Sequence, residues 1–146
     1  MKRIFVLIAI AFLVGIWSFW PSPSDQVLLE RSLSRIESGV SDHQLGTVLA
    51  EISENYEDET GWSKQSIRGI LFREFKKGSH FSLHIYPTAF QITPPTAKIT
   101  AEVTIVGGSI VHPNAEAEYF EVQFGYKQEE DKVWRLQTHT REQVEK

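Results

Sequence analysis

The spacing of apolar residues changes once along this chain, at Gly78. Before that glycine, apolar side chains recur every three or four residues, which is the period of an amphipathic helix. After it, they alternate with polar side chains, which is the period of a strand with one buried face. A fold made from these parts has helices first and strands afterwards. It cannot be a parallel α/β protein, in which helices and strands take turns along the chain.

Three helices are expected before Gly78, each with one apolar stripe. We expect Asp25 to cap the first, Ser41 to cap the second and Ser63 to cap the third. The second helix is expected to reach Tyr56, with Glu51 on its solvent side. The stripes consist of Leu29, Leu33, Ile36 and Val40, then Leu45, Val48, Leu49, Ile52 and Tyr56, then Ile67, Ile70, Leu71 and Phe75.

Four strands are expected after Gly78. Pro87 interrupts the first, Pro94 and Pro95 turn the chain into the second, and a charged turn at 128–132 separates the last two. Connections this short favour antiparallel pairing. We therefore predict an α+β fold, with three helices packed on a curved, four-stranded antiparallel sheet in a cone-like arrangement. The predicted inward-facing sets are Phe81, Leu83, Ile85, Phe90 and Ile92, then Ala97, Ile99, Ala101, Val103 and Ile105, then Phe120, Val122, Phe124 and Tyr126, then Trp134, Leu136 and Thr138.

An uncharged apolar run of 17 residues occupies positions 4–20. As a helix it reaches about 26 Å, enough to cross the hydrocarbon core of a bilayer with little tilt. Lys2 and Arg3 favour a cytoplasmic amino terminus, and Trp17 and Trp20 favour the opposite interface. The run predicts a single-pass anchor in a bacterial-type inner membrane, with the following domain in the periplasm. The alternative is a signal peptide cleaved near Ser24, which gives a secreted domain.

The predicted organisation is an anchor or uncleaved signal at 1–20, a spacer at 21–26, one domain at 27–141 and a polar tail at 142–146. After residue 20 the chain has 13 basic and 19 acidic residues, a net charge of −6. Nucleic acid and anionic lipid surfaces are therefore expected to be poor partners. The chain has no cysteine, which excludes disulfide bridges and lipid attachment to cysteine.

Three segments resemble the nuclear-transport-factor-2-like superfamily, also called cystatin-like, which includes ketosteroid isomerases and scytalone dehydratase. The segments are 45–56 (LGTVLAEISENY), 61–68 (GWSKQSIR) and 124–136 (FGYKQEEDKVWRL). The resemblance covers residues 27–141 and implies a cone of long antiparallel strands wrapped around three helices. This fold supports enzymes and non-enzymes alike, so it does not by itself assign a function.

Enzymes of the superfamily hold an Asp or His base inside the cone. Here the ionisable strand residues alternate with the inward sets, and we expect no carboxylate among those sets. We therefore predict no catalytic residue, metal site or cofactor. The expected function is non-enzymatic, either protein association or binding of a small hydrophobic ligand. A ketosteroid-isomerase-type isomerase or dehydratase is the alternative, which an inward-facing Asp, Glu or His in an apolar cavity would favour.

Two groups of residues are candidates for these binding roles. A ligand at the open end of the cone would contact Tyr56, Trp62, Leu71, Phe75, Phe90 and Trp134. The polar sheet face, which the superfamily commonly uses for dimerisation, predicts a homodimer or an envelope protein partner. It carries His84, Tyr86, Lys98, Thr100, Glu102, Glu121, Gln123, Arg135 and Gln137.

Overall fold

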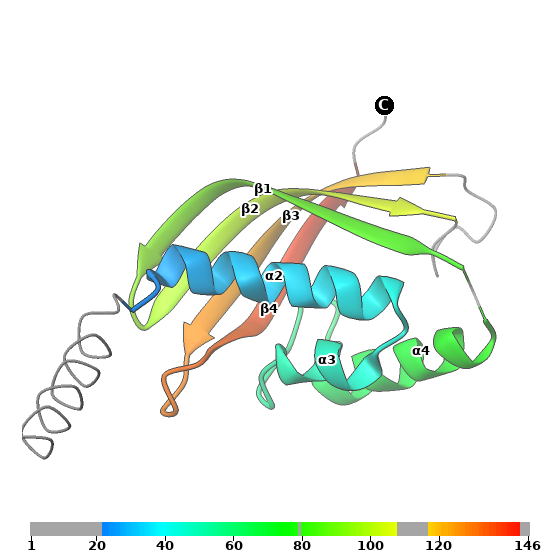
Figure 1. Ribbon diagram of the computed structural model, residues 1–146, viewed down its shortest axis with the longest axis horizontal. Coiled ribbons are helices and arrows are strands. Elements are labelled where there is room, and N and C mark those ends of the chain that lie inside the picture. Colours follow the sequence, from blue (N-terminus) through cyan, green and yellow to red (C-terminus); the bar gives the residue numbers. More distant parts are fainter. Residues whose placement is uncertain (1–21, 79, 108–116, 144–146) are drawn as a thin grey trace, which may run out of the picture.

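The computed structural model describes residues 22–78, 80–107 and 117–143. Its elements are α2 (Asp25–Ser41), α3 (Leu45–Ala50), α4 (Lys64–Lys76), β1 (Ser82–Thr93), β2 (Thr96–Val106), β3 (Ala117–Gln128) and β4 (Trp134–Gln143). The strands form one antiparallel sheet in the order β1-β2-β3-β4 (Figure 1). The predicted α+β class, with helices followed by four antiparallel strands, is confirmed.

No helix within the described ranges is long and apolar enough to cross a bilayer. The predicted anchor at residues 4–20 lies outside those ranges, as does most of the loop expected after Gly107.

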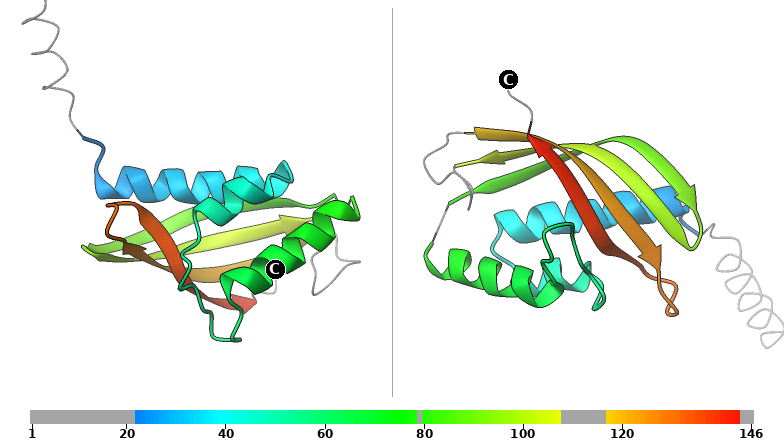
Figure 2. Two further views of the ribbon diagram at one scale, coloured as in Figure 1. Left: turned by 90° about the horizontal axis from the view of Figure 1, so that it is seen from below. Right: turned by 180° about the vertical axis from the view of Figure 1, so that it is seen from behind.

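The sheet is curved, and all three described helices lie on its concave side (Figures 1 and 2). The stripe on α2 packs there against the inward faces of the strands. Leu29 of α2 and Ile99 of β2 are fully buried at the centre of this contact. Side chains of this size each contribute about 1.5–3 kcal/mol when removed from water. The α2 stripe and the β2 and β3 inward sets were therefore predicted correctly, apart from Ile105, which is partly buried.

The start and end of α2 differ from the prediction. Ser24 is the cap, since its Oγ accepts a hydrogen bond from the Val27 amide, whereas Asp25 accepts one from Trp134 Nε1 at 2.9 Å. At the other end, Ser41 does not cap α3. Its Oγ accepts a hydrogen bond from the amide of Leu83 in β1.

The outer edge of β1 is partly closed by α2. Glu37 Oε2 accepts a hydrogen bond from the Ile85 amide at 2.8 Å, and Ser41 occupies the Leu83 amide two residues earlier. An open strand edge is a template for pairing with another chain. The polar side chains of α2 therefore block the first half of this edge.

Helix α3 is shorter than predicted and ends at Ala50. The chain then pairs with β4, where the Leu136 amide donates to Glu51 O and the Ser53 amide donates to Leu136 O, both at 2.9 Å. This pairing replaces the predicted helical turns up to Tyr56. Glu51 is buried rather than solvent-facing, and Arg35 Nη1 lies 2.9 Å from its Oε1.

Two bulges alter the predicted strands. Strand β1 continues through Pro87, and the interruption expected there is a register shift between Pro87 and Ala89. In β4 a register shift makes Gln137 an extra residue between Leu136 and Thr138. An extra residue moves all later side chains to the other face. The prediction that Thr138 faces inward and His139 outward was therefore wrong, because His139 pairs with the inward-facing Phe124.

Candidate functional site

Helix α4 lies beneath the half of the concave face where β1 begins and β4 ends (Figure 2). Ser63 caps it as predicted, through reciprocal hydrogen bonds with Ser66. No side chain of α4 is fully buried, although Ile67 and Leu71 pack partly against the core. Phe75 stacks on His43 with ring centroids 4.7 Å apart. This half of the sheet is thus faced by apolar side chains that are still partly accessible.

Three polar residues meet at the edge of this region. The Tyr56 hydroxyl is hydrogen-bonded to Nδ1 of His139, and the two rings stack with centroids 6.2 Å apart. Asp58 Oδ2 lies 4.0 Å from the same Nδ1. Tyr56 is almost wholly buried, whereas the His139 side chain keeps 25% of its surface exposed. We call Tyr56, Asp58 and His139 the inner cluster.

Asp58 shapes the loop that carries Tyr56 and Asp58 itself, the two members of the inner cluster that precede α4. Its Oδ1 accepts hydrogen bonds from the Thr60 amide (2.9 Å), the Thr60 hydroxyl (2.7 Å) and the Trp62 amide (2.9 Å). Burial alone would raise the pKa of Asp58, but these hydrogen bonds and the nearby His139 hold it below its usual value. The carboxylate is therefore ionised at neutral pH while fixing the turn between Tyr56 and α4.

Both ring groups of the inner cluster are neutral near pH 7. Burial raises the pKa of Tyr56 far above its usual value, and the Asp58 charge adds to this shift. Burial lowers the pKa of His139, although the Asp58 charge opposes that effect. Because tyrosine keeps its proton, its hydroxyl can donate to Nδ1. The imidazole proton then resides on Nε2, where it is free to donate to a ligand.

Two further charged residues lie on the concave face. Arg141 pairs with the inward-facing Val122, and its guanidinium carbon lies 5.7 Å from the Phe120 ring centroid. Glu118 is 4% exposed and pairs with Ile105. The prediction that the inward sets hold no carboxylate was therefore wrong. The alternation Phe120, Val122, Phe124 extends back to Glu118, so the sequence contained this signal.

Stability should depend on the protonation of His139. Its native pKa is lowered, so the unfolded chain, with a histidine pKa of about 6.5, binds a proton more readily. The stabilising effect of the neutral ring is therefore complete above about pH 6.5 and is lost as pH falls towards the native pKa. Between about pH 7.5 and pH 5, the melting temperature of the natural protein should fall more than that of His139→Gln. Parallel curves would contradict this.

The six predicted ligand residues do not form one cluster. Tyr56 and Trp62 flank Asp58, while Leu71 and Phe75 lie on α4. Phe90 lines a separate groove of about 310 Å³ between α2 and β1, together with Leu33 and Ile85. Trp134 is buried at the start of β4, beside the first turn of α2. The sequence missed His139, Arg141 and Asp58 as neighbours of Tyr56.

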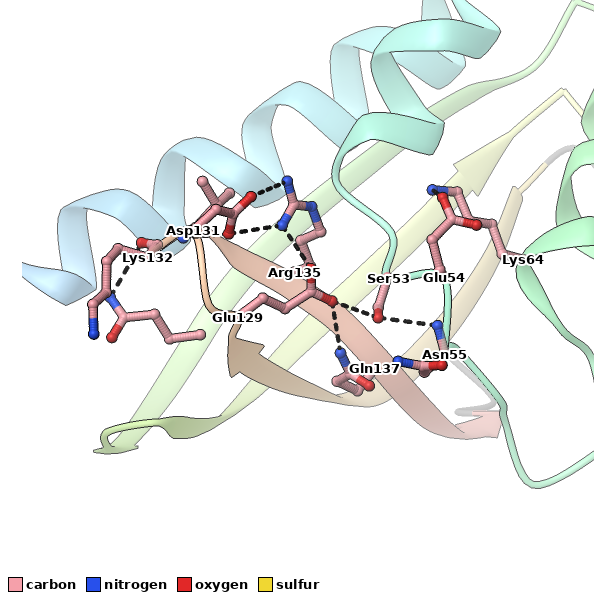
Figure 3. A network of polar contacts seen from close by, with 11 residues as sticks. Ser53, Glu54, Asn55, Lys64, Glu129, Asp131, Lys132, Arg135 and Gln137 are labelled. Atoms are coloured by element: carbon pink, nitrogen blue, oxygen red, sulfur yellow. Dashed lines mark hydrogen bonds and ion pairs between the residues drawn. The ribbon is translucent and has the colours of Figure 1, made fainter.

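The predicted interface residues lie in two environments. Arg135 and Gln137 belong to a polar network at the β3–β4 hairpin, where both bond to Glu129 and Arg135 also pairs with Asp131 at 2.8 Å (Figure 3). Ser53 joins this network through Glu129, beside a polar hollow of about 620 Å³. The others lie on strands β1 to β3, on the convex face, where Tyr86 is 59% exposed. Their role in dimerisation stays a prediction.

Metal binding finds no support in the described part of the chain, where no group of three or more histidine or acidic side chains is placed to hold an ion.

No protein-family model and no curated protein matches the sequence. Solved structures do resemble it. A Nostoc punctiforme protein of unknown function with a cystatin-like fold aligns with a TM-score of 0.64 at 12% identity, over 82% of this chain and 91% of that one. A nuclear-transport-factor-2-like protein from Cytophaga hutchinsonii gives 0.64 at 10% identity, over 84% and 100%.

A ketosteroid isomerase-like protein from Erwinia carotovora atroseptica gives a TM-score of 0.62 at 7% identity, over 86% of this chain and 100% of that one. Likenesses at such low identity show a common fold and leave the chemistry to the residues of each chain. The sequence resemblance is confirmed at that level, and the chain has the cystatin-like fold shared by nuclear-transport-factor-2-like and ketosteroid isomerase-like proteins.

Proposed function

We propose that this chain is a membrane-anchored extracytoplasmic domain that binds a small, mainly apolar molecule between α4 and the concave face of its sheet. The observation that carries the proposal is the β4 bulge, which turns His139 and Arg141 towards this space. An apolar surface with a few convergent polar groups is the usual composition of a small-molecule site. The anchor rests on the apolar run at 4–20.

The inner cluster suits a ligand with a carbonyl or hydroxyl group. A neutral His139 with its proton on Nε2 offers one donor at a surface that is still partly exposed. Partly buried Ile67 and Leu71 of α4 face the apolar strand residues and supply the contact for the rest of the molecule. The ligand would thus be held by apolar burial and oriented by one hydrogen bond.

Photolabelling with benzophenone, a small apolar ketone, tests this proposal on the full chain in detergent. Adducts mapped by mass spectrometry should fall on α4, on the start of β3 and on the end of β4. Leu71→Trp should block the space and reduce that labelling at least about tenfold. The matched control is Phe72→Trp, because Phe72 is the next residue and is 58% exposed. Equal labelling of α4 in both variants would refute the site. Labelling of the apolar run at 4–20 is the internal reference for the amount of adduct formed in each sample.

A second candidate function is isomerase- or dehydratase-type proton transfer at the same place. The observation that favours it is the inward-facing His139 hydrogen-bonded to Tyr56. In the other tautomer of His139 the proton is on Nδ1 and is donated to the Tyr56 oxygen, so Nε2 can accept a proton and return it. The test is conversion of 5-androstene-3,17-dione to the conjugated ketone, followed by its ultraviolet absorbance. Turnover should exceed background and be lost in His139→Gln. If the natural protein shows none while benzophenone labels the site, binding stands without this isomerisation.

A further inference from the structure

The charges of this chain are unevenly divided. Residues 62–77, which include α4, contain five basic residues and one acidic residue, a net charge of +4. The rest of the chain after residue 20 contains eight basic and 18 acidic residues, a net charge of −10. The total of −6 therefore hides a cationic helix, and the expectation that anionic surfaces are poor partners does not describe α4.

The outward side of α4 combines several of these cations with an exposed aromatic side chain. Arg68, Phe72, Arg73 and Lys76 are all exposed there, and Phe72 keeps 58% of its surface accessible. Trp62, which is 36% exposed, lies just before Ser63, the residue that caps the helix. Phe72 and Trp62 are two of the five large hydrophobic residues exposed in the described ranges.

The cations of residues 62–77 are only partly neutralised, because three of the five share two carboxylates. Glu74, whose side chain is only 14% exposed, lies 3.6 Å from Arg73 Nε and 3.2 Å from Lys77 Nζ. Lys64 pairs with Glu54 at 2.7 Å. Arg68 and Lys76 make no ion pair within the part of the chain that the structure describes. The outward side thus keeps an excess of positive charge around an exposed phenylalanine.

We propose that the outward side of α4 docks on an anionic lipid surface. A helix with exposed aromatic residues among cations binds at the headgroup level, through apolar insertion and attraction to anionic lipid. The proposal rests on the anchor of the proposed function. That anchor would end at residue 20, and α2 begins at Asp25, so the tether keeps the domain at a high effective concentration near the bilayer.

The fold allows this docking. Helices α2, α3 and α4 lie together on the concave side, so a bilayer that meets α4 leaves the convex face pointing away from it (Figures 1 and 2). Because α4 also covers the proposed ligand site, docking places that site next to the lipid. A lipid-soluble ligand would then reach the site without crossing bulk water.

Spin labelling of the full chain tests the docking, and the absence of cysteine makes single labels possible. A nitroxide is attached at Phe72→Cys, with Tyr86→Cys as a control on the convex face, since Tyr86 is similarly exposed at 59%. Each protein is reconstituted in phosphatidylcholine vesicles with or without about 30% phosphatidylglycerol. Accessibility to oxygen and to a water-soluble nickel complex then reports immersion of the label.

The label at Phe72→Cys should enter the lipid in the anionic vesicles and stay in water in pure phosphatidylcholine, while the label at Tyr86→Cys stays in water in both. High salt and the added pair Arg68→Gln and Lys76→Gln should each release the Phe72 label. A Phe72 label that is aqueous in both vesicles, or a Tyr86 label equally immersed, overturns the docking. Spin–spin broadening at Phe72 between protein molecules would assign this side to a second copy and also overturn it.

Flotation of the same samples with the vesicles tests docking through α4 and anchoring through the run at 4–20 separately. Protein that floats with phosphatidylcholine vesicles while its Phe72 label is aqueous in both lipids is anchored without docking through α4. Protein that floats only with anionic vesicles, and loses flotation in the Arg68→Gln and Lys76→Gln variant, supports docking without the anchor. Protein that floats with neither overturns both.

Discussion

Trp134→Ala should lower the free energy of unfolding by about 3–5 kcal/mol, in line with other buried tryptophan truncations. Trp134 is 3% exposed at the start of β4, and its Nε1 donates a hydrogen bond to Asp25 Oδ1. The side chain therefore joins the last strand to the first turn of α2 both by burial and by a polar contact. Urea unfolding of the full chain, followed by circular dichroism, measures the loss.

Trp134→Phe is the matched control for this truncation. Phenylalanine keeps most of the buried apolar surface and removes the hydrogen bond to Asp25, so we expect a loss of about 1–2 kcal/mol. Asp25 remains at the start of α2, where a negative charge is favourable. If the phenylalanine and alanine variants lose equal stability, the hydrogen bond rather than burial is the main contribution of Trp134.

Asp58→Ala should have the second largest effect, a loss of about 2–4 kcal/mol. The substitution removes the acceptor for two amides and one hydroxyl, and hydrogen bonds to a charged group contribute about 1.5–3 kcal/mol each, although not additively. It also frees the loop that positions Tyr56 beneath His139. Thermal unfolding measures the stability, and benzophenone labelling of α4 should weaken in the same variant.

Asp58→Asn separates the shape of the loop from its charge. The amide oxygen still accepts the bonds from Thr60 and Trp62, so the stability loss should be much smaller than for alanine. The pKa of His139 should fall further, because the Asp58 charge that raises it is gone. Titration of the His139 ring protons by NMR measures this change. An unchanged or raised pKa would show that Asp58 does not act on His139.

Local periodicity was sufficient to predict most of the architecture. The α2 stripe and the alternation in β2 and β3 identify core residues because both faces of these elements differ sharply in polarity. The extent of α3 was not predictable in this way. Its sequence continues at helical spacing to Tyr56. In the folded protein, however, the backbone groups of Glu51 and Ser53 form hydrogen bonds with Leu136, and only the folded sheet supplies that partner.

The candidate site could not be predicted from the alternation of apolar and polar residues along the strands. The extra residue in β4 reverses the face of His139 and Arg141, and nothing between Leu136 and Thr138 marks it. A Cβ on Gly125 would lie 2.8 Å from the Thr138 methyl group, so glycine at 125 accommodates the irregular pairing. Tyr56 and His139 are 83 positions apart and meet only after the loop folds against β4. Glu118, by contrast, was visible in the pattern of β3.

Because of the bulge in β4, the length of this strand, and not only its residue types, decides which side chains face inward. Deleting Gln137 would restore simple alternation and rotate each following side chain by half a turn about the strand. His139 and Arg141 would move to the outside, and Thr138 and Thr140 would line the interior. A single position that does not face the concave side thus determines which side chains of β4 line it. Deleting that position would exchange these side chains without substituting any of them.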